Sequence, residues 1–106
     1  MQIEMNNLIG KEVWFTHKKK GIIHGIVEKV EQDYCKRWYC TVKGFWLSLD
    51  RLFPTEELLR ERLTEYQYKT HNLTLDELAR LTCGRVQFSV NWGSLYDHPL
   101  VKEYCL

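Results

Sequence analysis

Residues 10–53 read GKEVWFTHKKKGIIHGIVEKVEQDYCKRWYCTVKGFWLSLDRLF, and this stretch alternates apolar with polar side chains in four short runs. Alternation with a period of two is typical of strands that bury one face and leave the other in solvent. Polar residues or glycine separate the runs, as expected for tight turns between antiparallel strands. The pattern predicts four strands, at residues 12–16, 22–31, 37–43 and 45–49.

The second predicted strand carries two irregularities. Ile23, Gly25 and Val27 share one face, and Val30 returns to that face only if an extra residue bulges out near Glu28 or the following lysine. A glycine inside a strand weakens it unless another group has to approach its backbone closely. Both irregularities are expected of a strand that curls within a small barrel.

Four or five short antiparallel strands cannot form a stable flat sheet with one wet face, so we expect them to close into a small barrel. Three motifs of the stretch are I-G-x-x-V-x-F from Ile9, I-x-G-x-V-x-x-V from Ile23 and L-F-x-T-x-E from Leu52. Through these motifs, residues 8–60 resemble Src-homology-3-like barrels of the Tudor and KOW kind. More narrowly, they resemble short uncharacterised proteins of phages and conjugative elements of gut Firmicutes. The resemblance implies a barrel that binds peptides or nucleic acid through strand faces and loops.

A helix is predicted directly after the barrel. Thr55 is a good N-cap, and Glu56 and Glu57 place negative charge in the first turn. Leu59 and Leu63 begin an apolar stripe, which we expect to pack on the barrel. The helix is expected to span residues 55–68.

The remaining residues predict a second helix, one strand and a short tail. Thr74 and Glu77 form a capping box, and Gly84 suits the position after the helix end. Residues 85–92 alternate as a strand, which either extends the barrel sheet or pairs with the same strand of a second copy. Pro99 begins a short C-terminal helix or an irregular tail.

The expected fold is therefore a single α+β domain spanning residues 1–106. A four- to five-stranded antiparallel Src-homology-3-like barrel occupies residues 8–53. Residues 54–106 form a helical extension with two helices, one further strand at residues 85–92, and a short C-terminal helix or tail.

The composition is that of an ordinary soluble domain. The chain has 106 residues and a formal net charge of +1, with 44% hydrophobic and 27% charged residues, so it lacks the basic excess of a dedicated nucleic-acid binder. The N-terminus has no basic patch followed by an apolar segment, and no apolar run is long enough to cross a membrane. We therefore expect a cytoplasmic protein that does not bind membranes and whose cysteines are reduced.

No motif of the sequence carries catalysis. The six glycines lie scattered at turns, and no HExxH or GxSxG pattern occurs. His24 is interpreted as a half-buried structural histidine, and Asp97-His98-Pro99 as a surface turn rather than part of a catalytic dyad. We expect no enzyme activity and no cofactor.

A metal or enzyme centre is one alternative, and it would use cysteine and histidine side chains. Cys35 and Cys40 lie on either side of a predicted turn, and His17 and His24 flank the first hairpin, from where they could face Cys40 across the sheet. The spacing lacks the close Cys-x-x-Cys pairs of structural zinc sites, so we expect no bound metal.

Aromatic and basic residues supply the candidate binding surface. The chain has four Trp, six Tyr and four Phe, and large rings often anchor interfaces, although a small barrel also fills its core with rings. Lysines and an arginine at two predicted turns could neutralise phosphates beside rings that stack on bases. The candidate residues are Trp14, Lys18, Lys19, Lys20, Lys36, Arg37, Tyr39, Trp46 and Trp92.

Near-neutral charge, abundant aromatic residues and the missing catalytic motifs favour a non-catalytic module that binds another protein. The resemblance to mobile-element proteins implies that the partner is host machinery, for example a defence nuclease that an anti-CRISPR-type inhibitor blocks. A small nucleic-acid-binding barrel that uses Lys18–Lys20, Lys36 and Arg37 is the alternative. Association of two copies through the strand at residues 85–92 would give a homodimer.

Overall fold

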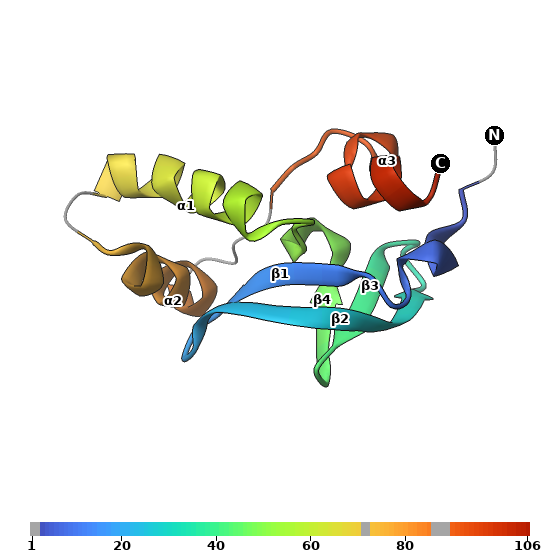
Figure 1. Ribbon diagram of the computed structural model, residues 1–106, viewed down its shortest axis with the longest axis horizontal. Helices are drawn as coiled ribbons and strands as arrows, with labels where there is room; N and C mark the ends of the chain where they lie inside the picture. The colour runs from blue at the N-terminus through green and yellow to red at the C-terminus, as the bar shows by residue number, and fades with distance from the viewer. Residues whose placement is uncertain (1–2, 71–72, 86–89) are drawn as a thin grey trace.

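The computed structural model describes residues 3–70, 73–85 and 90–106. It confirms the α+β class: two helices lie above a four-stranded antiparallel sheet of order β1-β2-β3-β4, and a third lies beside one end of the sheet (Figure 1). The strands are β1 Glu12–His17, β2 Gly21–Gln32, β3 Trp38–Val42 and β4 Phe45–Ser48. The helices are α1 Glu56–Thr70, α2 Leu75–Arg85 and α3 Pro99–Tyr104, with 3-10 turns η1 Met5–Leu8, η2 Leu49–Arg51 and η3 Leu95–Asp97.

The two irregularities of β2 occur where the sequence predicts them. The pairing of β2 with β3 shifts register between Val27 and Lys29, so Glu28 is the extra residue of a bulge. A Cβ atom at Gly25 would overlap with the buried Val42 side chain of β3, which explains why this position lacks a side chain. The bulge returns Val30 to the apolar face, where it packs against the core.

The sheet is open, because its order ends at β1 on one side and at β4 on the other. After β4 the chain makes the 3-10 turn η2, and Phe53 then forms an isolated antiparallel bridge with Trp14. Two backbone hydrogen bonds of 2.9 Å hold this bridge, one in each direction. Closure of the strands into a barrel therefore stays a prediction.

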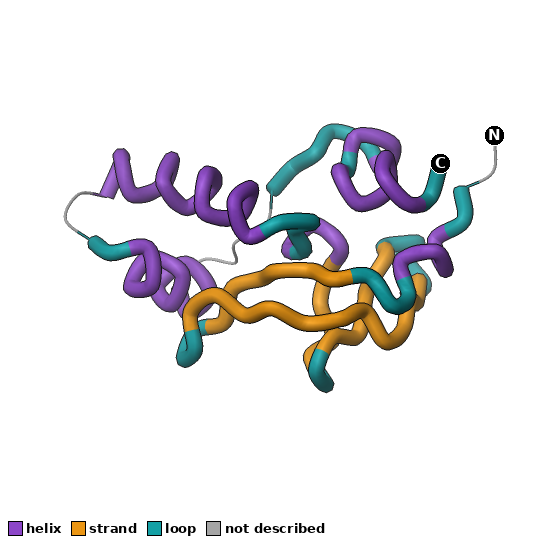
Figure 2. The backbone as a smooth tube through the Cα atoms, in the orientation of Figure 1, coloured by secondary structure: helices purple, strands orange, loops and turns teal. Residues whose placement is uncertain are grey.

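Apolar side chains form two clusters, one on each face of the β1–β2 hairpin. The first cluster lies between the sheet, η1 and α3 and includes Val13 and Phe15 of β1, as the alternation predicts. The second cluster lies where α1 and α2 pack side by side at one end of the molecule (Figure 2). Its buried members are Phe53, Leu59, Leu63, Leu78 and Ala79. Trp14 and Ile22 lie on the face of the hairpin opposite to Val13 and Phe15, and from that face they pack against this second cluster.

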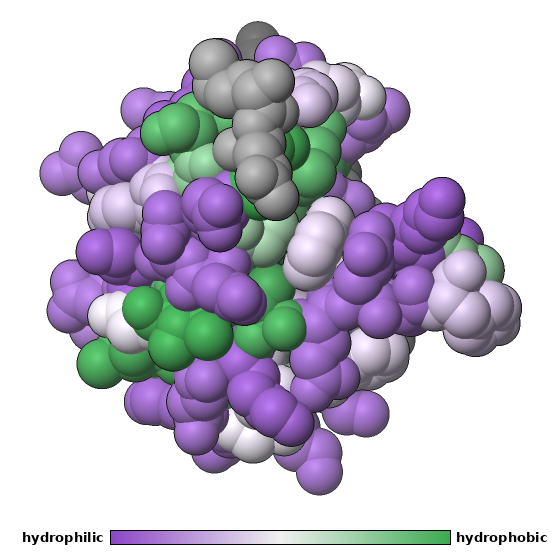
Figure 3. Space-filling view, turned by 90° about the vertical axis from the view of Figure 1, so that its right-hand side faces the viewer, coloured by the Kyte–Doolittle hydropathy of each residue, from purple (hydrophilic) through white to green (hydrophobic). Residues whose placement is uncertain are grey.

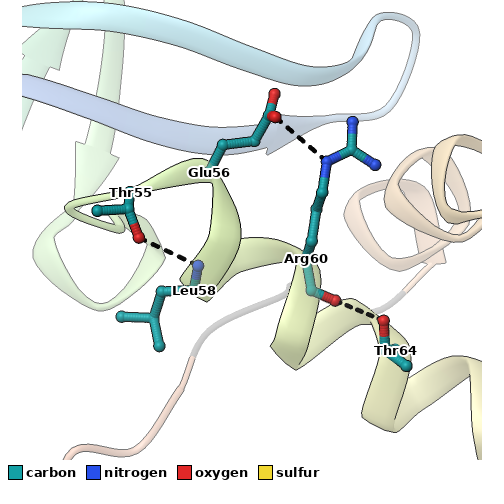
Figure 4. Close-up of polar contacts among 5 residues, drawn as sticks. All are labelled: Thr55, Glu56, Leu58, Arg60 and Thr64. Carbon is teal, nitrogen blue, oxygen red and sulfur yellow. Dashed lines mark hydrogen bonds and ion pairs between the residues drawn. The ribbon is translucent and has the colours of Figure 1, made fainter.

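The N-terminal turn of α1 follows its sequence signals. Thr55 Oγ1 accepts a hydrogen bond from the Leu58 amide at 3.1 Å, which confirms the predicted N-cap (Figure 4). Arg60 and Glu56, one turn apart, form an ion pair of 3.3 Å, and the Thr64 hydroxyl donates to the Arg60 carbonyl at 2.7 Å. These contacts begin the helix at Glu56, and it continues to Thr70, two residues beyond the predicted end.

The Thr74 cap of α2 is also confirmed, since Thr74 Oγ1 accepts from the Glu77 amide at 3.1 Å, and the Glu77 carboxylate reaches back to the Thr74 hydroxyl at 3.1 Å. The helix does not end at Gly84 but continues to Arg85. The strand predicted at residues 85–92 is therefore wrong at Arg85, and residues 90–92 are not a strand either. Residues 86–89 of that prediction lie outside the described residues, and pairing of two copies through this segment stays a prediction.

The last helix docks against the N-terminal turn. Pro99 occupies the first turn of α3, as predicted, and His98 caps the helix. The Glu4 amide donates to the Cys105 carbonyl at 3.1 Å, and the Asn7 side chain donates to the Tyr104 carbonyl at 3.0 Å. These bonds bring the two ends of the chain to the same end of the molecule.

Candidate functional site

The predicted binding residues do not form one surface. Tyr39 and Trp46 lie together on the outer face of β3 and β4. Lys36, Arg37 and Trp92 line a pocket beside the β2–β3 turn. Lys18, Lys19 and Lys20 form the β1–β2 turn, and Trp14 packs against the cluster between α1 and α2.

The aromatic pair of Tyr39 and Trp46 is the most exposed ring surface on the described sheet. The two rings stack with centroids 3.9 Å apart and planes inclined by 12°. Trp46 is 55% exposed, whereas the other three tryptophans are partly buried. Stacking holds both rings in fixed orientations, so a ligand would lose little side-chain freedom on binding them.

Beside the aromatic pair lies a pocket of about 460 Å³, which we call the side pocket. Ser48 connects the two features, because it pairs with Tyr39 across the strands and also lines the pocket. The volume falls within the range of small-ligand pockets. The lining residues are Gln32, Lys36, Arg37, Trp38, Ser48, Leu49, Asp50, Asn91, Trp92, Gly93, Ser94, Leu95 and His98.

The basic rim of the side pocket comes from a well-ordered turn between β2 and β3. The Asp33 carboxylate accepts hydrogen bonds from the Cys35 amide at 2.9 Å and the Arg37 amide at 2.8 Å. Lys36 adopts a left-handed conformation with φ of 64°, and the Gln32 side chain donates to its carbonyl at 3.1 Å. Neither Lys36 nor Arg37 forms an ion pair with any described residue, so both cations are available to an acidic ligand.

His98 forms part of the pocket wall, and the prediction that it lies in a surface turn is wrong. It is 1% exposed, because the loop before α3 folds its ring into the interior rather than into solvent. The Leu100 amide donates to Nδ1 at 3.1 Å, which requires Nδ1 to be unprotonated, and Nε2 then donates to the Leu49 carbonyl at 2.8 Å. Burial lowers the pKa of His98 to about 4, although the Leu49 hydrogen bond opposes this shift.

Trp92 and Asp50 complete the chemistry of the wall. Trp92 lies between His98, at a ring-centroid distance of 5.2 Å, and Arg62, whose guanidinium lies 5.2 Å from the indole centroid. Desolvation by burial raises the pKa of Asp50. The site therefore contains a neutral imidazole, a cation-facing indole and a partly desolvated carboxyl, and the hydroxyl of Ser94, which also lines the pocket, donates to the Asp97 carboxylate at 3.1 Å.

The His24 side chain is 47% exposed, close to the half-burial predicted for it from the sequence. Its ring stacks on Trp14 with a centroid distance of 4.4 Å and an interplanar angle of 15°. Its Nε2 lies 3.4 Å from a carboxylate oxygen of Glu12. These contacts occur on the outer face of the β1–β2 hairpin, away from the buried Cys40.

The cysteine and histidine side chains that the structure describes do not converge. Cys40 and Cys105 are buried in the first apolar cluster, whereas Cys35 is exposed in the β2–β3 turn. Burial, together with the neighbouring Cys105, raises the pKa of Cys40 to about 12. Among the side chains that the structure describes, those of residues 3–65, 73–82 and 90–106, no three His, Cys, Asp or Glu groups are close enough together to hold a metal ion.

Apolar side chains are also exposed outside these sites, including Ile9, Ile26 and Leu106. Figure 3 shows the end of the molecule that carries the two chain ends, where apolar residues lie in patches among hydrophilic ones. Some apolar exposure is ordinary for a small domain, so these patches do not mark a site by themselves.

Sequence reasoning found the basic turn and the aromatic pair but missed the pocket beside them. Trp38, Asp50 and His98 line that pocket and come from segments that are distant in sequence. The one signal that could have located His98 was Pro99, since a helix that starts at a proline places the preceding residue at its cap.

Comparisons of the chain with protein-family models, with curated proteins and with solved structures find no match. Within the described part of the chain, no helix has the length and apolar character needed to cross a membrane.

Proposed function

We propose that this chain is a non-catalytic protein-interaction domain that binds its partner through the aromatic pair and the side pocket. The observation that carries the proposal is the stack of Tyr39 and Trp46 beside a pocket whose rim holds two cations that form no ion pair with any described residue. Exposed aromatic rings next to a cationic rim are typical of interface hot spots.

The chemistry of the surface favours a partner segment that is both apolar and acidic. Trp46 and Tyr39 offer flat apolar contact, and Lys36 and Arg37 offer charge-assisted hydrogen bonds to a carboxylate. Arg37 presents a planar guanidinium that can bind a carboxylate with two hydrogen bonds. The partner is therefore expected to present an acidic side chain or a chain-terminal carboxylate close to an apolar side chain.

The fold proposed for this module is an Src-homology-3-like barrel. The bridge between Trp14 and Phe53 supports it, because it follows a 3-10 turn after β4 and returns the chain to β1. The resemblance of residues 8–60 to proteins of phages and conjugative elements adds a context. In that context the partner is bacterial host machinery in the cytoplasm, and an anti-CRISPR-type inhibitor is one form of such a module.

The proposal is tested by affinity capture from a bacterial host lysate with the wild-type chain and with the double variant Tyr39→Ala/Trp46→Ala. A protein that the wild type retains should be lost with the double variant. Leu106→Ala is the matched control, since Leu106 is 52% exposed, close to the 55% of Trp46, but does not line the side pocket. Equal recovery by all three proteins, or no recovery above background, would contradict the proposal.

The partner chemistry is tested separately with the charge-reversal variant Lys36→Glu/Arg37→Glu. We expect this variant to lose the captured partner at low salt, because an acidic segment would then face like charges. The wild-type complex should weaken as salt rises, since both cations lie at the solvent-exposed rim.

A further inference from the structure

A second hollow, of about 650 Å³, lies between the β1–β2 turn and the β3–β4 turn, and we call it the basic hollow. Both turns project from the same side of the strands (Figure 2). Lys43 of the second turn therefore lies across the hollow from Lys20 of the first, a grouping that the sequence does not reveal. The lining residues are Lys20, Ile22, Ile23, His24, Lys43 and Phe45.

Positive charge dominates the rim of the basic hollow. Lys18, Lys19, Lys20 and Lys43 are all exposed, and none of the four forms an ion pair with a described residue. Burial first, and then the charges of the three lysines of the first turn, lower the pKa of His17. The imidazole thus senses a local positive potential despite the net charge of only +1.

Acidic groups lie near the basic hollow but do not line it. The Glu12 carboxylate contacts His24 at 3.4 Å, and Asp76 of α2 lies beside Gly21. No carboxylate is among the lining residues, in contrast to the side pocket, which Asp50 lines.

The wall of the basic hollow is partly apolar and includes two rings, those of His24 and Phe45. The His24 ring forms part of it and is supported from behind by its stack on Trp14. Phe45 is held by edge contact with Phe15 at a centroid distance of 5.8 Å and by a tilted contact with His17 at 5.0 Å. Pre-positioned planar side chains beside cations are the arrangement that single-stranded nucleic acids recognise.

We propose that the basic hollow binds single-stranded nucleic acid, with phosphates against Lys20 and Lys43 and a base against the supported His24 ring. An acidic peptide would match the charges but would not use the flat ring surface. This site goes beyond the protein-binding surface and does not depend on it. Phe45 and Trp46 are neighbours in β4, so their side chains point to opposite faces of the strand.

The test is fluorescence anisotropy of a fluorescein-labelled oligothymidine and oligouridine, each of about 12 nucleotides, titrated with the full chain. Binding is measured between about 50 and 200 mM salt, because neutralised phosphates release counterions. For single strands the logarithm of the affinity changes with the logarithm of salt by about 0.7 per contact, so Lys20→Gln/Lys43→Gln should make the slope shallower by about 1.4. Lys102→Gln, which removes an exposed lysine of α3, should keep the wild-type slope.

Three outcomes would overturn the proposal. One is no binding of either oligonucleotide at the lowest salt, and another is an unchanged slope in the double variant. The third is displacement of the oligonucleotide by polyglutamate as efficiently as by unlabelled oligothymidine, which would identify a general anion surface. All of the substituted residues are exposed, and each variant is checked for folding by circular dichroism before it is titrated. His24→Ala removes the ring on which a base would stack, so it should weaken binding about 5- to 100-fold while the salt slope stays unchanged.

Discussion

Replacement of His98 by asparagine is expected to remove a specific acid sensitivity from this fold. The buried His98 ring accepts from the Leu100 amide and donates to the Leu49 carbonyl, an arrangement that only the neutral ring can satisfy. Protonation would place a second N–H opposite the Leu100 amide and a charge in the interior. Asparagine can still cap α3 through its side-chain oxygen, but it does not titrate in this range.

The magnitude follows from the pKa values of the folded and unfolded chains. Burial holds the pKa of His98 at about 4, against 6.5 when the chain is unfolded. Between these two values the unfolded chain binds more protons, so the free energy of unfolding falls as the pH falls from 6.5 to about 4. The full difference corresponds to about 3 kcal/mol, a large share of the stability of a domain of this size.

The assay is urea unfolding followed by circular dichroism at a series of pH values from neutral to about 4. Over this range the free energy of unfolding of the wild type should fall by about 3 kcal/mol more than that of His98→Asn. At neutral pH the stabilisation that depends on the neutral His98 ring should be fully present. His24→Asn is the control, since it removes an exposed histidine and should leave the His98-dependent loss in place. Parallel curves for the wild type and His98→Asn would refute the reasoning.

Three further predictions concern packing, capping and thiol reactivity. Gly25→Ala should lower the free energy of unfolding in urea by about 1–3 kcal/mol, because the new Cβ meets the Val42 side chain. The double variant with Val42→Ala should be less destabilised than the sum of the two single variants, and an effect equal to that sum would contradict the contact. Thr74→Ala should cost about 1 kcal/mol in thermal unfolding because it removes the cap of α2, and an unchanged midpoint would contradict that role. A thiol reagent at pH 8 should label the exposed Cys35 in the folded chain but Cys40 only after unfolding, since burial raises the pKa of Cys40 to about 12. Peptide mapping identifies the labelled cysteine, and equal labelling rates for the two residues would show that the core opens.

The alternation of β1 and β2 predicted which side chains are buried, because strand periodicity is a local property. The bulge at Glu28 followed from the same pattern, since Val30 could reach the core in no other way. Thr55 and Thr74 were predicted as caps because capping depends on residues only three positions apart.

Features that depend on distant segments were not accessible from the pattern. His98 looked like a turn residue, and it is buried only because Leu49 and Trp92 lie against its ring. From the sequence, the lysines of the β1–β2 turn were grouped with Lys36 and Arg37. In the structure Lys20 shares a hollow with Lys43, while Lys36 lines the side pocket. Such groupings arise from the twist and bend of the sheet, which residue spacing does not encode.

The hydrogen bond between the Glu4 amide and the Cys105 carbonyl has a practical consequence for engineering. Because the chain enters and leaves at one point, the domain could be inserted into an exposed loop of another protein without separating that loop's two ends. The same geometry permits circular permutation, with a short linker between the original ends and new ends opened at Gly44 in the β3–β4 turn. When the original ends are fused into a host protein, the β1–β2 and β3–β4 turns lie on the side of the domain away from the host and stay accessible (Figure 1).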